Sequence, residues 1–240
     1  MNRRSGLSAM LRLKNEQEFI QPCIESIIDW FDEVVVCMQG SSDNTEQIIR
    51  DFNSPKVSIY HYPHDSWPNG DGYGKQDPNH PMSRTYFYNW CMERTTRTHV
   101  CKWDGDMVAL DWLGDEVHDR MRHNPETIWF KGVDIVGKEL THIGERIYCA
   151  DEPRIFEVTP RTKYVNGSKC ERLQTSGGSE YHIEMAAYLH FKWAKPLSSA
   201  TQAWPDNWHE SAHFQNIIKR AQPVKRYNGE YPRAIRDRMS

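Results

Sequence analysis

Apolar segments that alternate with helix-like segments over the first 60 residues constrain the fold of this chain most strongly. Residues 7–13, 33–38 and 57–60 are short and apolar, as buried strands are, and the second is rich in β-branched side chains. Residues 15–32 carry an apolar stripe at helical spacing, and a second helix is expected to end near residue 52. This strand–helix–strand–helix–strand order predicts an α/β protein with a mostly parallel sheet flanked by helices.

A long segment rich in Pro, Gly, His and Asp interrupts the pattern at residues 61–82. Loops of this length are usually functional lids or disordered segments. The elements expected beyond it are a helix at 83–96, a strand ending at Asp104, a helix at 111–123, strands at 127–136 and 186–191 separated by a strand- and loop-rich section, and a polar helical tail. Because the sequence has no clear linker, we expect a single domain over residues 1–240.

Composition narrows the class of protein. The 240 residues are 38% hydrophobic, enough to fill a sizeable core, and the net charge of −3 gives no general attraction to nucleic acid. The six cysteines are scattered without a Cys-x-x-Cys pair, which argues against a zinc ribbon and for reduced thiols in the cytoplasm. No apolar run approaches the roughly 20 residues of a membrane span, and the basic N-terminus lacks the apolar region of a signal peptide.

Asp104-Gly105-Asp106 stands where an apolar strand-like segment ends. In an extended segment residues i and i+2 point to the same face, so both carboxylates can serve one site. Paired carboxylates suit a hard divalent cation such as Mg²⁺ or Mn²⁺, which shares its coordination shell with phosphates. Such triplets are also common on solvated turns, but ligands of α/β sheets gather at the carboxyl ends of strands. The motif therefore predicts a metal site at this edge of the sheet.

Three motifs in order resemble those of nucleotide-sugar glycosyltransferases with the GT-A fold, specifically the family-2-like group. Lys14-Asn15-Glu16 is similar to the early Asn-Glu signature of that family, and the turn 40–45 is similar to its Gly-Ser-Thr-Asp-Asn-Thr turn. The triplet 104–106 matches its Asp-x-Asp motif, and Asn89 lies fifteen residues earlier, as the Asn of the family's Arg-Asn pair does. The resemblance implies a Rossmann-like GT-A fold with a nucleotide-sugar-binding half at about 1–110 and an acceptor-side half at about 111–240.

The function implied by this resemblance is metal-dependent glycosyl transfer with inversion. A sugar would pass from a nucleotide-diphosphate donor to a hydroxyl of a glycan or glycolipid acceptor. Asp106 would bind Mn²⁺ or Mg²⁺, and Asp104 would reach the metal and the donor. His190 is a candidate for a third metal ligand or a phosphate contact, although a lone buried His is more often an ordinary core residue. Peripheral membrane association and the oligomeric state stay open.

The donor nucleotide is expected to contact the loops after the first two strands, and here the chain departs from the family. The residues implied by resemblance are Asn15, Glu16, Ser41 and Asn89. Gln39 replaces the acidic residue that can recognise uracil in the family, so the choice of base is open. The Arg of the Arg-Asn pair falls at Tyr88, while Arg84 lies one helical turn earlier on the same face. Arg84 either replaces that guanidinium at the phosphates or forms a surface salt bridge.

An inverting transferase also needs a general base for the acceptor hydroxyl, and a carboxylate is the usual choice. Cys170-Glu171 falls where many family members have His-Glu, which makes Glu171 the first candidate. Glu180 and Glu184 are rivals. Any of these three residues that is not the general base is expected to be an ordinary solvated Glu on the surface.

Two other functions fit parts of the sequence. A nucleotidyltransferase also uses a metal and a nucleotide, but usually carries a Gly-rich loop with Arg and Lys where this chain has Lys14-Asn15-Glu16. A non-catalytic glycan-binding protein would account for the nine Trp and eleven Tyr, because aromatic faces bind sugar rings, but would not need Asp104 or Asp106. The tryptophans that could stack on a sugar, rather than simply pack, are Trp67, Trp193 and Trp204.

Overall fold

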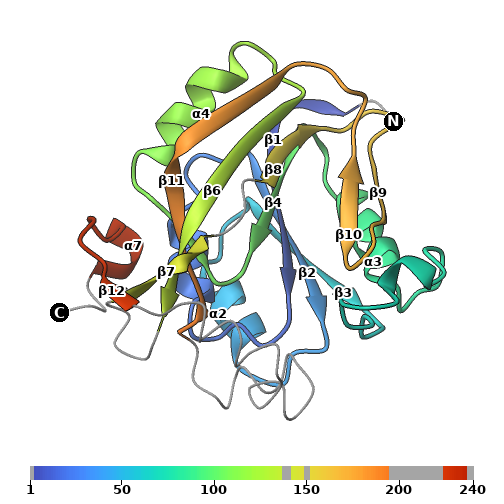
Figure 1. The fold of residues 1–240 in the computed structure, drawn as a ribbon, viewed down its shortest axis with the longest axis horizontal. Helices are drawn as coiled ribbons and strands as arrows, with labels where there is room; N and C mark the ends of the chain where they lie inside the picture. Colours follow the sequence, from blue (N-terminus) through green and yellow to red (C-terminus); the bar gives the residue numbers. More distant parts are fainter. Residues whose placement is uncertain (1–2, 137–141, 149–151, 195–223, 237–240) are drawn as a thin grey trace.

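The computed structural model of the chain describes residues 3–136, 142–148, 152–194 and 224–236 (Figure 1). The strands are β1 Arg4–Leu13, β2 Glu33–Gln39, β3 Val57–Tyr62, β4 Arg97–Asp104, β5 Met107–Ala109, β6 Thr127–Val136, β7 His142–Tyr148, β8 Glu152–Glu157, β9 Lys163–Asn166, β10 Glu171–Gln174, β11 Glu180–Trp193 and β12 Val224–Arg226. The helices are α1 Ile20–Glu25, α2 Thr45–Asp51, η1 Tyr73–Lys75 (3₁₀), α3 Arg84–Met92, α4 Leu113–Met121 and α7 Arg233–Arg236.

One large sheet of ten strands organises the described part of the chain. Eight of the strands follow the order β12-β7-β6-β8-β4-β1-β2-β3, while β11 also pairs with β6, and β5 pairs with β11. Strands β3, β2, β1 and β4 are parallel, as the alternating pattern of the first 60 residues predicts. Beyond β4 the sheet is mixed, because β8 runs antiparallel to both β4 and β6. The α/β fold class is therefore confirmed, with four adjacent parallel strands in the N-terminal half and one further parallel pair, β6 and β11, in the C-terminal half.

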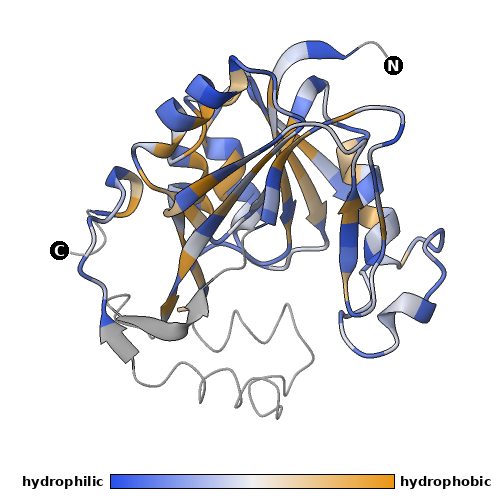
Figure 2. Ribbon diagram, turned by 45° about the horizontal axis from the view of Figure 1, so that its top comes forward, coloured by the Kyte–Doolittle hydropathy of each residue, from blue (hydrophilic) through white to orange (hydrophobic). Residues whose placement is uncertain are grey.

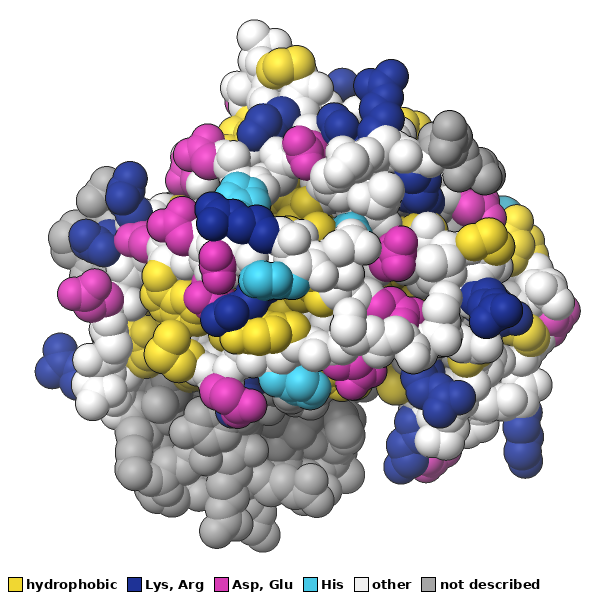
Figure 3. Space-filling view, turned by 90° about the horizontal axis from the view of Figure 1, so that it is seen from above, with side chains coloured by type: hydrophobic (Ala, Val, Ile, Leu, Met, Phe, Trp, Pro, Cys, Tyr) yellow, Lys and Arg dark blue, Asp and Glu magenta, His cyan; other side chains and the backbone are white. Residues whose placement is uncertain are grey.

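Alternate side chains of the parallel strands form two cores on opposite faces of the sheet. Leu11 and Trp103 pack with α1, α2 and α4, whereas Met10 and Val100 pack with α3. The strands are the most apolar elements in the ribbon of Figure 2, as expected for strands covered on both faces. On the face shown in Figure 3, basic and acidic side chains are interspersed, in keeping with the small net charge.

The first helix is much shorter than the sequence predicts. It covers six residues, Ile20–Glu25, instead of 15–32. Asn15 has the left-handed backbone conformation (φ 56°), which an α-helix excludes. The backbone N–H group of Glu16 donates to Thr45 Oγ1 at the start of α2, at 2.7 Å, and that of Gln17 donates to Asp43 Oδ2 in the turn before α2, at 3.2 Å. Contacts with the second turn therefore delay the start of the helix.

The long loop at 61–82 is attached to α3 and to the β9–β10 hairpin. Tyr73, in η1, is buried, and its hydroxyl lies 3.0 Å from Thr85 Oγ1. The Tyr62 hydroxyl donates to the Pro81 carbonyl at 2.5 Å, which closes the loop across its ends. The loop is thus anchored at its centre and at both ends.

No helix within the described ranges is long and apolar enough to cross a membrane. The five cysteines in these ranges are free thiols, and Cys149 lies outside them. The expected polar helical tail is described only at 224–236, where it forms the short strand β12 and the short helix α7.

Candidate active site

A cleft of about 890 Å³ lies at the carboxyl ends of β1, β2 and β4. These strands end at Leu13, Gln39 and Asp104, and all three residues line it. The opposite walls come from β6, β8, β10 and β11, so the cleft joins the two halves of the sequence. A concave site of this size at the carboxyl ends of parallel strands is where α/β proteins bind nucleotides and other small molecules.

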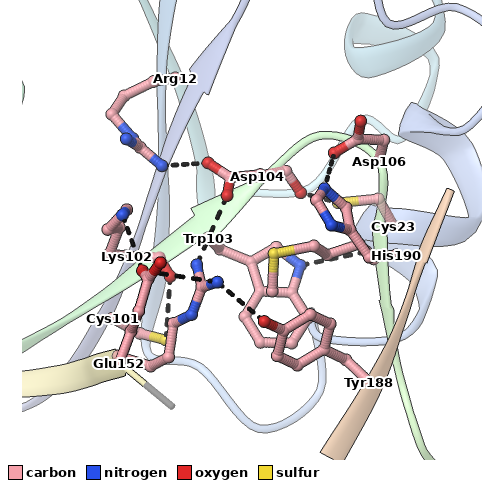
Figure 4. A network of polar contacts seen from close by, with 12 residues as sticks. Arg12, Cys23, Cys101, Lys102, Trp103, Asp104, Asp106, Glu152, Tyr188 and His190 are labelled. Atoms are coloured by element: carbon pink, nitrogen blue, oxygen red, sulfur yellow. Dashed lines mark hydrogen bonds and ion pairs between the residues drawn. The ribbon is translucent and has the colours of Figure 1, made fainter. Parts of the chain in front are cut away.

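Asp106 and His190 meet at one end of this cleft. Asp106 lies in the turn between β4 and the short strand β5, and β11 runs antiparallel to β5 with His190 opposite Met107. The backbone N–H of Phe191 donates to the Asp106 carbonyl at 2.8 Å. His190 Nε2 is 3.2 Å from Asp106 Oδ1 (Figure 4). Both side chains are largely buried. The structure therefore brings together two of the three expected metal ligands, although 84 positions separate them in the sequence (190 minus 106).

This pair fits a hard divalent cation. His190 Nδ1 lies 2.8 Å from Asp134 Oδ1, and an imidazole that donates its proton there would direct the Nε2 lone pair to a cation bound beside Asp106. Adjacent ligands of an octahedral cation at about 2.1 Å are themselves about 3.0 Å apart, close to the separation of Nε2 and Oδ1. Among the described residues no three metal-ligand side chains converge, so phosphate oxygens and water would have to complete the coordination.

Asp104 lies in a cationic environment that the motif does not reveal. One carboxylate oxygen is bound by Arg12, its cross-strand neighbour on β1, and the other lies 3.4 Å from Arg154 Nη1 on β8. Lys102 and Glu152 extend the network through an ion pair at 2.9 Å (Figure 4). Burial alone would raise the pKa of Asp104, but Arg12, Lys102 and Arg154 together hold it well below its usual range. Asp104 is thus the shared counter-ion of two buried arginines.

The wall formed by α3 and the β9–β10 hairpin carries Arg84 and Glu171. Arg84 Nε is 3.6 Å from Glu171 Oε2, and Arg84 Nη2 donates to the Tyr88 hydroxyl at 3.2 Å. The guanidinium of Arg12 stacks over the Tyr88 ring, 4.2 Å from its centroid. Arg12, on β1, thus brings a second guanidinium to this wall beside that of Arg84. Burial raises the pKa of Tyr88, which keeps its hydroxyl protonated.

Three expected donor-binding residues lie outside the cleft lining and hold loops together. The Asn15 backbone N–H donates to Ser41 Oγ at 3.1 Å, and Asn15 Oδ1 accepts from the Ser42 N–H at 2.8 Å. The side-chain amide of Asn89 donates to the Tyr164 carbonyl at 2.9 Å and accepts from the Tyr164 N–H at 2.7 Å. Asn15 and Ser41 therefore join the first two loops, and Asn89 joins α3 to β9.

The remaining candidates divide between the cleft and the surface. Glu16 and Gln39 line the cleft, and Gln39 Nε2 donates to the His64 carbonyl at 3.0 Å and to Ser66 Oγ at 2.7 Å. Glu180 also lines the cleft, with its side chain 51% exposed. Glu184 is exposed and outside the lining. Trp67 stacks on His80 at 4.4 Å within its own loop, while the side chain of Trp193 and all of Trp204 fall outside the described parts of the chain.

Sequence reasoning missed Arg12, Lys102, Asp134 and Arg154, all of which line the cleft. Each is a charged strand residue directly beside a fully or largely buried apolar one, which is Leu11, Trp103, Val133 or Ile155. A charged side chain at such a position is rare without a partner or a ligand, so its presence in the strand is the sequence signal that could have identified these residues.

Comparison with known proteins agrees with this architecture. Residues 8–70 match the family model for glycosyl transferase family 2. No curated protein sequence matches the chain. Crystal structures of Staphylococcus aureus TarS 1–349 are similar in fold, with a TM-score of 0.53 at 14% identity over 78% of this chain and 60% of that one. The complex with UDP-GlcNAc gives 0.54 at 12% identity over 78% of this chain and 58% of that one.

The chain thus spans about 60% of the length of these TarS structures. At such low identity the likeness concerns the fold, and it confirms the expected GT-A fold, while the match to glycosyl transferase family 2 covers residues 8–70.

Proposed function

Starting from a GT-A fold whose residues 8–70 match glycosyl transferase family 2, we propose that this chain is a metal-dependent, inverting nucleotide-sugar glycosyltransferase. The observation that carries the proposal is the meeting of Asp106 and His190, 3.2 Å apart, at one end of a cleft bounded by the carboxyl ends of β1, β2 and β4. Residues up to about 110 would bind the donor, and the later residues would complete the site and receive the acceptor.

The donor in this proposal is a nucleoside diphosphate sugar. One TarS structure of the same fold contains UDP-GlcNAc, which makes this compound the first donor to test. Both protons of the Gln39 amide are donated to the 61–82 loop, so its carbonyl oxygen is the group that would face a base. An acceptor there suits a base with a ring N–H, such as uracil.

The leaving diphosphate develops negative charge as the glycosidic bond breaks. A Mg²⁺ or Mn²⁺ ion held by Asp106 and His190 would neutralise that charge. Arg12, Lys102 and Arg154 carry three positive charges beside the two negative charges of Asp104 and Glu152, so this network adds a net positive charge to the floor of the cleft. Positive charge fixed in place before the reaction stabilises a leaving anion without reorganisation.

Glu171 is the general base of the proposed reaction. Its side chain is 7% exposed and lines the cleft, and Arg84 faces one carboxylate oxygen and so orients the group. In a single displacement the acceptor hydroxyl gives its proton to Glu171 while its oxygen bonds to the anomeric carbon. The bond from that carbon to the diphosphate oxygen breaks at the same time, which inverts the centre. The acceptor would be a hydroxyl of a glycan or glycolipid.

A panel of nucleoside diphosphates and nucleotide sugars, each with and without Mn²⁺, tests the proposal by thermal shift. A ligand at a hundredfold excess over its Kd stabilises the native state by about 2.7 kcal/mol. We expect a Mn²⁺-dependent shift for one base, and its loss in Asp106→Asn with the melting temperature of the free protein maintained.

The products distinguish the proposed reaction from its rivals. A transferase releases a nucleoside diphosphate from the sugar donor, whereas a nucleotidyltransferase releases pyrophosphate from a nucleoside triphosphate. Glycan binding that is unchanged in Asp106→Asn, together with no nucleotide shift, would refute the proposal in favour of a non-catalytic glycan-binding protein.

A further inference from the structure

Asp134 lies behind His190, on the side away from Asp106. It is located in β6, which pairs with β11 in parallel, and the register sets Asp134 opposite His190. Its side chain is 6% exposed, and Oδ1 lies 2.8 Å from His190 Nδ1. A carboxylate so deeply buried inside a sheet is costly unless charged or polar groups compensate it. Asp134 belongs to none of the sequence motifs, and its neighbours in β6 are the buried apolar residues Val133 and Ile135.

The two neighbouring strands fix the backbone of His190 but not its ring. The register of β5 and β6 on either side of β11, and the hydrogen bond from Phe191 to the Asp106 carbonyl, hold the main chain. The imidazole can still turn about its own side-chain torsions and can carry its proton on either nitrogen. The contact with Asp134 holds the ring in one orientation, with Nδ1 toward Asp134 and Nε2 toward Asp106, and a cation at Asp106 would require the tautomer protonated on Nδ1.

We propose that Asp134 is a positioning residue, which holds His190 as an Nε2 ligand for a hard divalent cation bound together with Asp106. The inference rests on the cation site of the proposed function and adds the residue that prepares it. A carboxylate that accepts from the distal nitrogen of a ligating His orients the ring and raises its basicity. Loss of such a partner typically weakens metal affinity about 10–100-fold.

The observed contacts among Asp106, His190 and Asp134 would also fit a different role for Asp134. A protonated His190 could bridge Asp106 and Asp134 as a plain ion pair, with no cation between its Nε2 and Asp106. In that case Asp134 would matter for stability and not for metal affinity. The two roles differ in whether nitrogen is bound to the metal.

Electron paramagnetic resonance of the protein with Mn²⁺ and UDP distinguishes these two roles of Asp134. In the wild-type protein we expect electron spin-echo modulation from a ¹⁴N nucleus bound to Mn²⁺. In Asp134→Asn we expect a Kd for Mn²⁺ that is about 10–100-fold weaker and a reduced ¹⁴N modulation. Asp119→Asn is the matched control, because Asp119 pairs with Arg122 on the exposed surface of α4. Its Kd and modulation should equal those of the wild type.

Three results would contradict either the cation site at His190 or the role of Asp134. Mn²⁺ binding without ¹⁴N modulation in the wild type, or no Mn²⁺ binding, would refute the cation site at His190 and with it this part of the proposed function. Wild-type modulation that persists in Asp134→Asn with an unchanged Kd would refute the role of Asp134 alone. If Asp134→Asn does not fold, ¹⁵N spectroscopy of the wild-type protein with Mg²⁺ and UDP decides, because a His190 protonated on Nε2 contradicts the inference.

Discussion

Replacement of Asp104 by Asn should destabilise the protein, because the first carboxylate of the Asp-x-Asp motif is the counter-ion of two buried arginines. The side chains of Arg12 and Arg154 are each 4% exposed, and both contact Asp104. An amide of the same shape can accept from one guanidinium, but its NH₂ group then faces the other. Arg12 and Arg154 would be left as like charges without the shared anion between them.

The size of the effect follows from how buried the pairs are. Removal of one partner of a fully buried ion pair costs about 3–5 kcal/mol. Asp104 is 32% exposed, and Arg154 keeps Glu152 at 3.5 Å, so part of the interaction is screened or replaced. We therefore expect a loss of about 2–3 kcal/mol in the free energy of unfolding, which lowers Tm by roughly 5–10 °C in a chain of this length.

Urea unfolding followed by tryptophan fluorescence measures the loss. Asp65→Asn is a suitable control, because Asp65 forms an exposed ion pair with Lys14 on the cleft rim. A loss below about 0.5 kcal/mol for Asp104→Asn, equal to that of an exposed pair, would refute the role of Asp104 as a buried counter-ion.

The pH dependence provides a second check on Asp104. Its pKa is lowered in the folded state, so the stability it contributes is present above the unfolded-state pKa of about 3.9 and is lost as the pH falls toward the folded-state value. The difference in stability between wild type and Asp104→Asn should therefore be constant from about pH 5 to 8 and shrink below about pH 4. A difference that does not shrink in acid would contradict the electrostatic explanation.

Three further variants test other parts of the structure. Asn89→Ala removes two hydrogen bonds to the Tyr164 backbone and should cost about 1–3 kcal/mol in urea unfolding, whereas an unchanged midpoint would contradict its role in joining α3 to β9. Gly132→Ala adds a methyl group that overlaps the ring of the fully buried Tyr188, so we expect a loss of about 1–3 kcal/mol by the same assay, and none if the ring can move aside. Gln39→Ala should weaken binding of the preferred nucleoside diphosphate in calorimetry by about tenfold, with little change in Tm, and equal affinity would exclude Gln39 from base recognition.

Local sequence patterns determined most of the secondary structure. The strands expected at 33–38 and 57–60 are β2 and β3 with one or two more residues, and the strand at 127–136 is β6 as predicted. Period-two and helical apolar patterns are properties of neighbouring residues, so they can be recognised without knowledge of the rest of the chain. The sequence also indicated that Asp104 and Asp106 end a strand, which is why one edge of the sheet could be identified as the candidate site.

Only the tertiary structure decided what surrounds these two carboxylates. Asp106 meets His190, and Asp104 meets Arg154, because β11 and β8 return to the sheet beside β5 and β4. The register of these pairs depends on long-range contacts, and a shift of one residue would turn every side chain to the other face of its strand. Asp134 opposes His190 for the same reason, through the register of β6 and β11. The residue types that make a site are visible in the sequence, whereas the strand pairing that brings them 2.8–3.4 Å from each other is a property of the folded chain as a whole.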